Sequence, residues 1–136
     1  MAENVFIEDH LKILNDKLTN ENKQCYISGD FNFDLLKVSS HDETFNFFDT
    51  MMSSFLLPTI TLPTKINSVK STVIYNIFTN HLHPDLKTGN VTVSISDHLP
   101  LFLIVPKQNQ NHLPKTQNLY SRDMIFLIEN ILYLII

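Results

Sequence analysis

The chain has 136 residues, of which 43% are hydrophobic and 18% are charged, a balance that excludes a disordered tail and indicates one globular domain. Its formal net charge of −4 argues against a protein that is held on nucleic acid by a broad basic surface. The single cysteine, Cys25, excludes an intramolecular disulfide, and its apolar neighbours predict an inert core side chain.

The first half of the chain predicts a helix, a short strand and a second helix. Residues 4–18 are expected to form an amphipathic helix, and residues 24–28 a buried strand that is followed by a loop. Residues 42–56 are expected to form the second helix, because Ser40 and Glu43 have the spacing of a capping box. The apolar stripe expected on this second helix consists of Phe45, Phe48, Met52, Phe55 and Leu56.

The second half of the chain predicts strands joined by loops. Polar and apolar residues alternate over residues 71–79, which predicts a strand, and residues 80–90 are expected to form a loop. Residues 91–95 alternate again, and residues 101–105 form a continuous apolar strand. Strands separated by helices, with hairpins near the end, indicate an α/β (α+β) layered domain.

The C-terminal part of the chain changes in composition. Residues 1–106 are expected to form the domain, residues 107–123 a polar linker, and residues 124–136 an apolar tail. The tail is shorter than the roughly 20 residues that a membrane-spanning helix needs, so it predicts a buried or association-prone segment and no membrane anchor. Residues 1–18 lack the continuous apolar core of a signal peptide.

Three polar clusters lie where apolar strands are expected to end. They are residues 29–32 (GDFN), residues 71–76 (STVIYN) and residues 96–98 (SDH). Each alone also fits a plain structural interpretation: a loop that caps a strand, a half-exposed strand, and a solvent-facing turn. An aspartate beside a histidine between two apolar strands is costly to desolvate unless both groups are used, which favours a functional site at residues 96–98.

The order of these motifs is more specific than any one of them. GDFN after a strand is followed by a helix, by PTKI, by STVIYNIFTN and by SDHLPLF. This series resembles the endonuclease/exonuclease/phosphatase superfamily, and most closely the endonuclease domain that precedes the reverse transcriptase in non-LTR (LINE-type) retrotransposons. The resemblance covers about residues 5–105, which correspond to the C-terminal half of that domain. It implies a partial two-sheet α/β sandwich of the DNase I-like type, and a Mg²⁺-dependent phosphodiesterase that acts on nucleic acid.

The resemblance also implies roles for residues of these motifs. Asp30 would position or deprotonate the attacking water, and Asn32 would donate a hydrogen bond to a phosphate oxygen. Asp97 would bind Mg²⁺, and His98 would contact the phosphate and stabilise the transition state. The residues implied in substrate binding are Asn32, Ser71 and Asn76.

Two departures from the family pattern predict that activity is lost. Tyr75 stands where the family has an aspartate that orients the catalytic histidine, and a tyrosine carries no negative charge at neutral pH. The family's other metal ligands, a glutamate and an asparagine on early strands, have no counterpart ahead of Asp30. The Mg²⁺ site at Asp97 is therefore expected to be incomplete, because one carboxylate is a poor solitary ligand.

The leading hypothesis is accordingly a truncated, retrotransposon-derived endonuclease-like domain that does not cut nucleic acid alone. Half of the sandwich would leave a sheet face uncovered, so self-association, or a partner chain that supplies the missing half, is expected. The alternative is a non-catalytic interaction module that uses this sheet face and the apolar tail. A third hypothesis is an active enzyme that works as an oligomer. The resemblance implies a location in the nucleus or the cytoplasm.

Two other sets of residues carry weaker signals. His81 and His83 lie near Asp85, but a zinc site needs three or four converging ligands. Lys65 and Lys70 could contact a phosphate backbone, although solvated loop lysines are the simpler interpretation.

Overall fold

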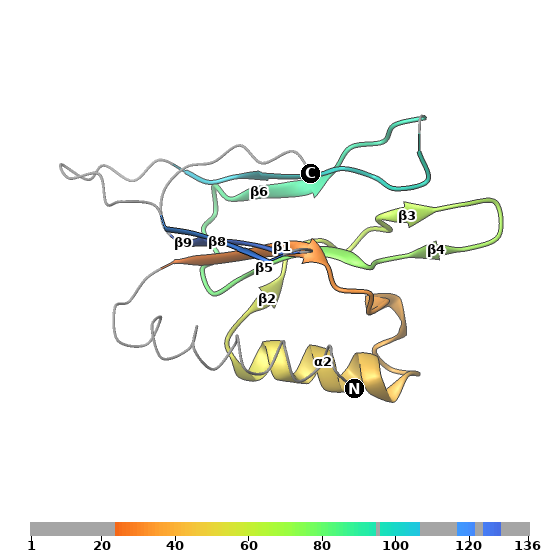
Figure 1. Cartoon of the computed structure of the whole chain (residues 1–136), viewed down its shortest axis with the longest axis horizontal. Coiled ribbons are helices and arrows are strands. Elements are labelled where there is room, and N and C mark those ends of the chain that lie inside the picture. The colour runs from red at the N-terminus through yellow and green to blue at the C-terminus, as the bar shows by residue number, and fades with distance from the viewer. Residues whose placement is uncertain (1–23, 95, 107–116, 122–123, 129–136) are drawn as a thin grey trace.

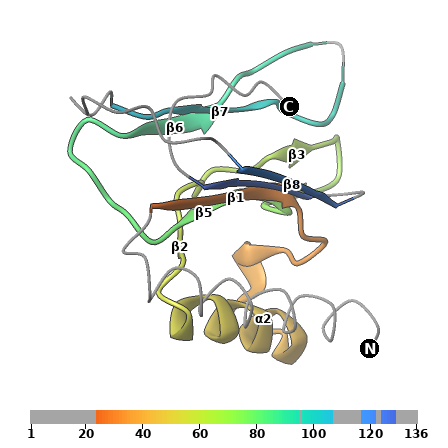
Figure 2. The same cartoon turned by 60° about the vertical axis from the view of Figure 1, so that its left-hand side comes forward.

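The computed structural model describes residues 24–94, 96–106, 117–121 and 124–128; the helix expected over residues 4–18 lies outside these ranges. The described residues form a mixed α+β structure around an antiparallel sheet. Its strands, in spatial order, are β2 (Leu57–Pro58), β5 (Tyr75–Thr79), β1 (Cys25–Asp30), β9 (Met124–Ile128) and β8 (Gln117–Ser121). The helix α2 (Asp42–Ser53) lies below this sheet in Figure 1, and the hairpin of β6 (Lys87–Asn90) and β7 (Leu101–Ile104) lies above it. Figure 2 shows the same three layers from another side.

Two apolar cores hold these layers together. The core between the sheet and α2 consists of Cys25, Ile27, Phe31, Phe47, Met51, Leu56 and Phe78. The core between the sheet and the hairpin consists of Tyr26, Ile60, Ile77, Leu101 and Leu103. Successive residues of β1 and of β5 alternate between the two cores, as the two-residue period of a strand requires. Both faces of this strand pair are therefore covered, whereas the sequence predicted an open sheet face.

Cys25 is an inert core residue, as expected. Its side chain is 0% exposed and forms no disulfide. Burial raises the pKa of its thiol from 9.0 to about 12, because a thiolate would lose its hydration in the core. The thiol is therefore protonated at neutral pH and is a poor nucleophile.

The strand expected over residues 71–79 is interrupted. Ser71–Thr72 forms β4, which pairs with β3 (Lys65–Ile66), and β5 begins only at Tyr75. Between them, the carbonyls of Val73 and Ile74 accept hydrogen bonds from the loop after β1. These bonds replace the pairing of a regular strand, so the break joins the β3–β4 hairpin to the GDFN loop.

The last third of the domain differs from the sequence prediction. Residues 80–90 were expected to be a loop, but Lys87–Asn90 forms β6. A strand was expected over residues 91–95, but residues 91–94 form no strand, and Ile95 is not described. A Cβ on Gly89 would lie 2.8 Å from Cε1 of Phe102 on the paired strand, so this position accepts only glycine without a shift of that ring. β7 thus pairs closely with the polar residues 87–90 and not with the alternating apolar residues that follow them.

The segment predicted as a polar linker contains β8, and the apolar tail contains β9. β9 pairs with the edge of β1, with Cys25 opposite Ile128 and Gly29 opposite Met124. Over Met124–Ile128 the tail therefore extends the sheet at its edge. No helix in the described ranges is long and apolar enough to cross a membrane.

The N-terminus of α2 is formed differently from the predicted capping box. His41 is the N-cap, and its Nδ1 accepts a hydrogen bond from the backbone N–H of Thr44 at 3.3 Å. Ser40 is used elsewhere, because its hydroxyl donates to the carbonyl of Lys37 at 3.4 Å. That carbonyl closes the 3-10 helix η1 (Leu35–Lys37), which directly precedes α2.

The apolar stripe predicted for α2 was wrong by about one position. Its buried residues are Thr44, Phe47 and Met51, whereas Phe45 and Met52 are 52% and 37% exposed. The predicted row of side chains and the buried row lie next to each other on this helix. Both are largely apolar, and the residues within each row have the same helical spacing. The rings of Phe31, Phe33 and Phe78, which contact Phe47 with centroids at 5.5, 4.5 and 5.8 Å, select the face that packs.

α2 ends in a Schellman motif, three residues before the predicted end at residue 56. The N–H of Phe55 donates to the Met52 carbonyl, and the N–H of Leu56 donates to the Met51 carbonyl. Leu56 and Met51 also meet in the core below the sheet. Phe55 has a φ of 57° and is 80% exposed, so a bulky residue occupies the left-handed position that glycine favours.

We expect Met51→Ala to destabilise the domain by about 2–5 kcal/mol, because it leaves a cavity under a side chain that is 1% exposed. Met52→Ala, on the exposed side of the same turn, is the matched control and should change stability by less than about 1 kcal/mol. Urea unfolding followed by circular dichroism measures both. Equal effects of the two substitutions would show that the described face of α2 is not the packed one.

We expect Phe55→Gly to stabilise the domain by about 1 kcal/mol, since glycine adopts a positive φ without the steric cost of a Cβ. Phe55→Ala removes the same exposed ring but keeps the Cβ, so it should give no such gain. The midpoints of thermal unfolding compare the two variants. A gain that is equal in both would assign the effect to the lost apolar surface and not to the backbone.

Candidate functional site

The ends of the two central strands bring two of the motifs together. Asp30 is the last residue of β1 and lies opposite Tyr75, the first residue of β5. Both positions are in phase with Tyr26 and Ile77, which belong to the core on the hairpin side of the sheet. Asp30 and Tyr75 therefore face the layer that carries residues 96–98.

Backbone hydrogen bonds hold residues 96–98 at this end of the sheet. The carbonyl of Asp97 accepts from the N–H of Ile66 at 2.8 Å, and His98 forms an isolated bridge with Lys65. The hydroxyl of Ser96 accepts from the backbone N–H of His98 at 3.1 Å, which closes the turn. The SDH motif is thus bound to β3 before it continues into β7.

Thr64 connects these segments, and sequence reasoning missed it as an individual site residue. Its side chain is 0% exposed, and its hydroxyl accepts from the backbone N–H of Tyr75 at 3.1 Å. Its N–H donates to the Thr72 carbonyl, and its carbonyl accepts from the N–H of Leu99, both at 2.8 Å. The available signal was the PTKI motif, in which a threonine follows a proline in an extended stretch.

Four side chains form a cluster at this point, called here the Tyr75 cluster: Asp30, Tyr75, Asp97 and His98. The hydroxyl of Tyr75 contacts Nδ1 of His98, and the two ring centroids lie 5.3 Å apart. Nε2 of His98 lies 3.5 Å from Oδ1 of Asp97, and both side chains remain accessible, at 40% and 44% exposure. The sequence-predicted residues Asp30, Asp97 and His98 are therefore brought together around Tyr75.

The electrostatics of the cluster keep Tyr75 protonated. Burial raises the pKa of its hydroxyl, and the negative charges of Asp30 and Asp97 and a hydrogen bond with Asp30 raise it further. A protonated hydroxyl that donates to the Asp30 carboxylate leaves its oxygen free to accept from Nδ1–H of His98. Tyr75 can thus orient the imidazole, but it brings no charge of its own.

The predicted substrate-binding residues differ in how accessible their side chains are. Asn32 is exposed in the loop after β1, with a φ of 57°, and its N–H donates to Oδ1 of Asp30 at 3.0 Å. Ser71 is exposed in the β3–β4 hairpin, opposite Ile66. Asn76 is 1% exposed, and its side-chain oxygen accepts from three backbone N–H groups, those of Thr59, Ile60 and Ile77. Only Asn32 and Ser71 are thus open to a ligand.

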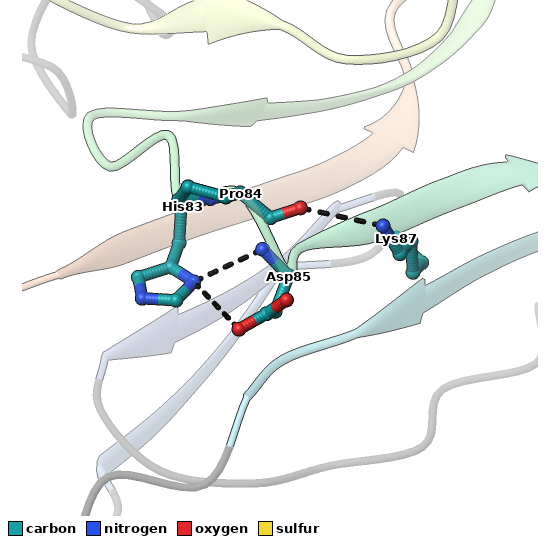
Figure 3. Close-up of polar contacts among 4 residues, drawn as sticks. All are labelled: His83, Pro84, Asp85 and Lys87. Carbon is teal, nitrogen blue, oxygen red and sulfur yellow. Dashed lines mark hydrogen bonds and ion pairs between the residues drawn. The ribbon is translucent and has the colours of Figure 1, made fainter.

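The histidine pair after β5 forms a local turn. Nδ1 of His83 accepts from the backbone N–H of Asp85 at 3.1 Å, and it lies 3.8 Å from Oδ2 of the same residue, as Figure 3 shows. Accepting the N–H requires an unprotonated Nδ1, so the hydrogen bond is favoured over a charged pair. Nζ of Lys87 donates to the Pro84 carbonyl at 3.3 Å and closes the turn. These contacts explain the turn without a metal ion.

Among the residues that the structure describes, no group of three or more His, Cys, Asp or Glu side chains could hold a metal ion. Comparison with protein-family models, with curated proteins and with solved structures found no match. The chemistry of the Tyr75 cluster therefore carries the functional argument.

We expect Asn76→Leu to destabilise the domain by about 2–4 kcal/mol, because the N–H and the carbonyl of Ile60 lose their buried partner. Asn67→Ala is the control. Its side chain accepts from Val69 and Lys70 in an exposed turn, where water replaces it, so the loss should stay below about 1 kcal/mol. Urea unfolding measures both. A stable Asn76→Leu variant that no longer binds a phosphodiester would restore the predicted substrate role.

Proposed function

We propose that this chain is the C-terminal half of an endonuclease domain of the endonuclease/exonuclease/phosphatase type, and that it binds a phosphodiester without hydrolysing it on its own. The observation that carries this proposal is the clustering of Asp30, Asp97 and His98 around Tyr75: Asp30 lies opposite Tyr75 in the sheet, His98 contacts its hydroxyl, and Asp97 lies beside His98. These residues come from motifs that are far apart in the sequence and that are joined in space at one accessible end of the sheet.

The cluster offers the groups that phosphodiester binding needs. Nε2 of a protonated His98 and the side-chain amide of Asn32 can donate hydrogen bonds to phosphate oxygens. Lys65 pairs with His98 through the backbone and adds a positive charge at the same place. Asp30, which accepts the N–H of Asn32, fixes the loop and can orient a water molecule.

Mg²⁺ fits this donor set only together with a phosphate. Asp30 and Asp97 supply two carboxylates close to one hydroxyl, and Mg²⁺ uses one or two carboxylates along with substrate phosphates and waters. When bound, the ion would offset the negative charge of the phosphate and of its reacting oxygens. Asp97, which the sequence predicted as the metal ligand, would hold it from the side of the SDH motif.

Tyr75 is the reason for proposing that the chain does not hydrolyse the phosphodiester. A carboxylate at this position would stabilise a protonated His98, and a protonated tyrosine does not. The same two aspartates that could serve a metal ion also raise the pKa of Tyr75, so its phenolate is further disfavoured. The imidazole is oriented but its positive charge is not stabilised at Nδ1, and transition-state stabilisation is correspondingly weak.

An interaction module remains the second candidate, on a different surface from the one first expected. Phe45 and Phe55 of the α2 region are 52% and 80% exposed, and Leu36 of η1 is 52% exposed. Large apolar side chains that are exposed in this region favour a protein contact. A domain that stays monomeric, with no change of oligomeric state in Phe45→Ser, would count against this candidate.

Calorimetry with Mg²⁺ and a dinucleotide tests the proposed function. We expect Mg²⁺ binding only when the dinucleotide is present, and we expect Asp97→Asn to abolish it. Asp85→Asn, which changes an exposed aspartate in the turn after β5, is the matched control and should leave binding unchanged. Mg²⁺ binding that is indifferent to Asp97→Asn would refute the site. Nicking of plasmid DNA that His98→Ala abolishes would refute the proposed lack of hydrolysis.

A further inference from the structure

α2 carries a second apolar row beside the one that packs under the sheet. Phe45, Phe48 and Met52 repeat at helical spacing along this flank, which is called here the second row of α2. None of the three belongs to the two apolar cores of the described residues. Phe45 and Met52 are 52% and 37% exposed, and Phe48 is half-buried. Large apolar side chains placed in this way gain free energy when another element covers them.

The side of α2 that points away from the sheet is polar. Asn46, Asp49 and Ser53 repeat at helical spacing there, and all three are exposed. A helix that was open to water on every side but the sheet would need no apolar residues on its flank. The contrast between this polar side and the second row therefore indicates that one flank of α2 faces a neighbouring element.

A segment of this chain outside the described ranges has the pattern that such a neighbour needs. Ile7, Leu11, Leu14 and Leu18 lie on one side of the amphipathic helix that the sequence predicts over residues 4–18. At a rise of 1.5 Å per residue, this apolar row would extend over roughly 16 Å. α2 itself, from Asp42 to Ser53, is about 18 Å long by the same measure. The two rows therefore match in length and in chemistry.

The place where β1 begins allows this segment to reach α2. Cys25, the first residue of β1, shares a core with Met51 and Leu56 at the C-terminal end of α2, and Figure 1 shows β1 beginning at that end. Residues 19–23 can extend over roughly 17 Å, whereas packed helix axes lie about 8–10 Å apart. A helix over residues 4–18 can therefore lie beside α2, in the same direction, without strain in the connection.

We propose that the second row of α2 is the docking surface for residues 4–18 of the same chain, which pack on it as a helix through their own apolar row. The inference is independent of the proposed function, because the Tyr75 cluster lies on the opposite side of the sheet from α2. It also differs from the interaction-module candidate, in which Phe45 is free to contact another protein. With residues 4–18 in place, this flank is closed to a partner.

Hydrogen exchange of the full chain, followed by mass spectrometry of peptides from residues 4–18, tests the docking. We expect these amides to exchange at least about tenfold more slowly than those of an unstructured chain. Phe48→Asp should remove this protection, because it places a charge under the docked segment. Asn46→Asp adds the same charge on the exposed side of α2 and should leave the protection unchanged. Protection of β1 and β5 in the same experiment verifies that each variant is folded. Unprotected amides in the parent chain, or protection that survives Phe48→Asp, would overturn the proposal.

A tryptophan on the second row identifies the occupant from the other side. The chain has no tryptophan, so the emission of a Met52→Trp variant reports on this position alone. We expect emission at a shorter wavelength than that of tryptophan in water, and a shift to longer wavelength when Leu14→Asn is added. Asp16→Asn, on the opposite side of the predicted helix, is the matched control and should give no shift. A water-like emission in Met52→Trp alone contradicts the docking. Emission that depends on protein concentration and not on Leu14→Asn assigns the surface to a second copy of the chain and likewise contradicts it.

Discussion

β1 and β5 lie side by side in antiparallel register, from Tyr26 opposite Thr79 to Asp30 opposite Tyr75. This pairing places one apolar face toward α2 and the other toward the β6–β7 hairpin, so both cores depend on it. A shift of the register by one residue would exchange the two faces of one strand. It would also separate Asp30 from Tyr75, and the fold and the candidate site therefore depend on the same hydrogen-bonded pair.

Thr64 extends this constraint to the remaining motifs. Its buried hydroxyl and its backbone bond to Tyr75, Thr72 and Leu99, which belong to three different segments. Buried polar groups that are fully hydrogen-bonded specify one arrangement, because any alternative leaves some of them without partners. The backbone of Thr64 therefore connects the segment after the SDH motif to β4, and its side chain connects the same point to β5.

The exposed end of the sheet carries a local cation in a protein whose net charge is negative. The net charge is −4, yet Lys65 forms a backbone bridge with His98 of the Tyr75 cluster. Long-range steering by the whole protein is not expected from such a distribution, and affinity would come from close contacts. Tyr75 keeps its proton at neutral pH, and this is why the proposed function is to hold a phosphodiester and not to cleave it.

Local sequence patterns determined the strand at residues 24–28, the helix after Ser40 and the strand at 101–105, since apolar periodicity and turn residues act over a few neighbours. The motifs also indicated Asp30, Asp97 and His98 as candidates. Their convergence is a tertiary fact, because it depends on the register of two strands that are about 45 residues apart in the chain.

Packing decided which face of α2 is buried, because two apolar stripes have equal spacing and the contacts of Phe47 with Phe31, Phe33 and Phe78 distinguish them. It likewise decided that Lys87–Asn90, and not the apolar alternation after it, pairs with β7, where Gly89 admits the ring of Phe102. The environment of Asn76 was likewise decided by the tertiary structure. The sequence marks it as polar and accessible to a substrate, but three backbone N–H groups brought together by the fold bind its side chain inside the protein.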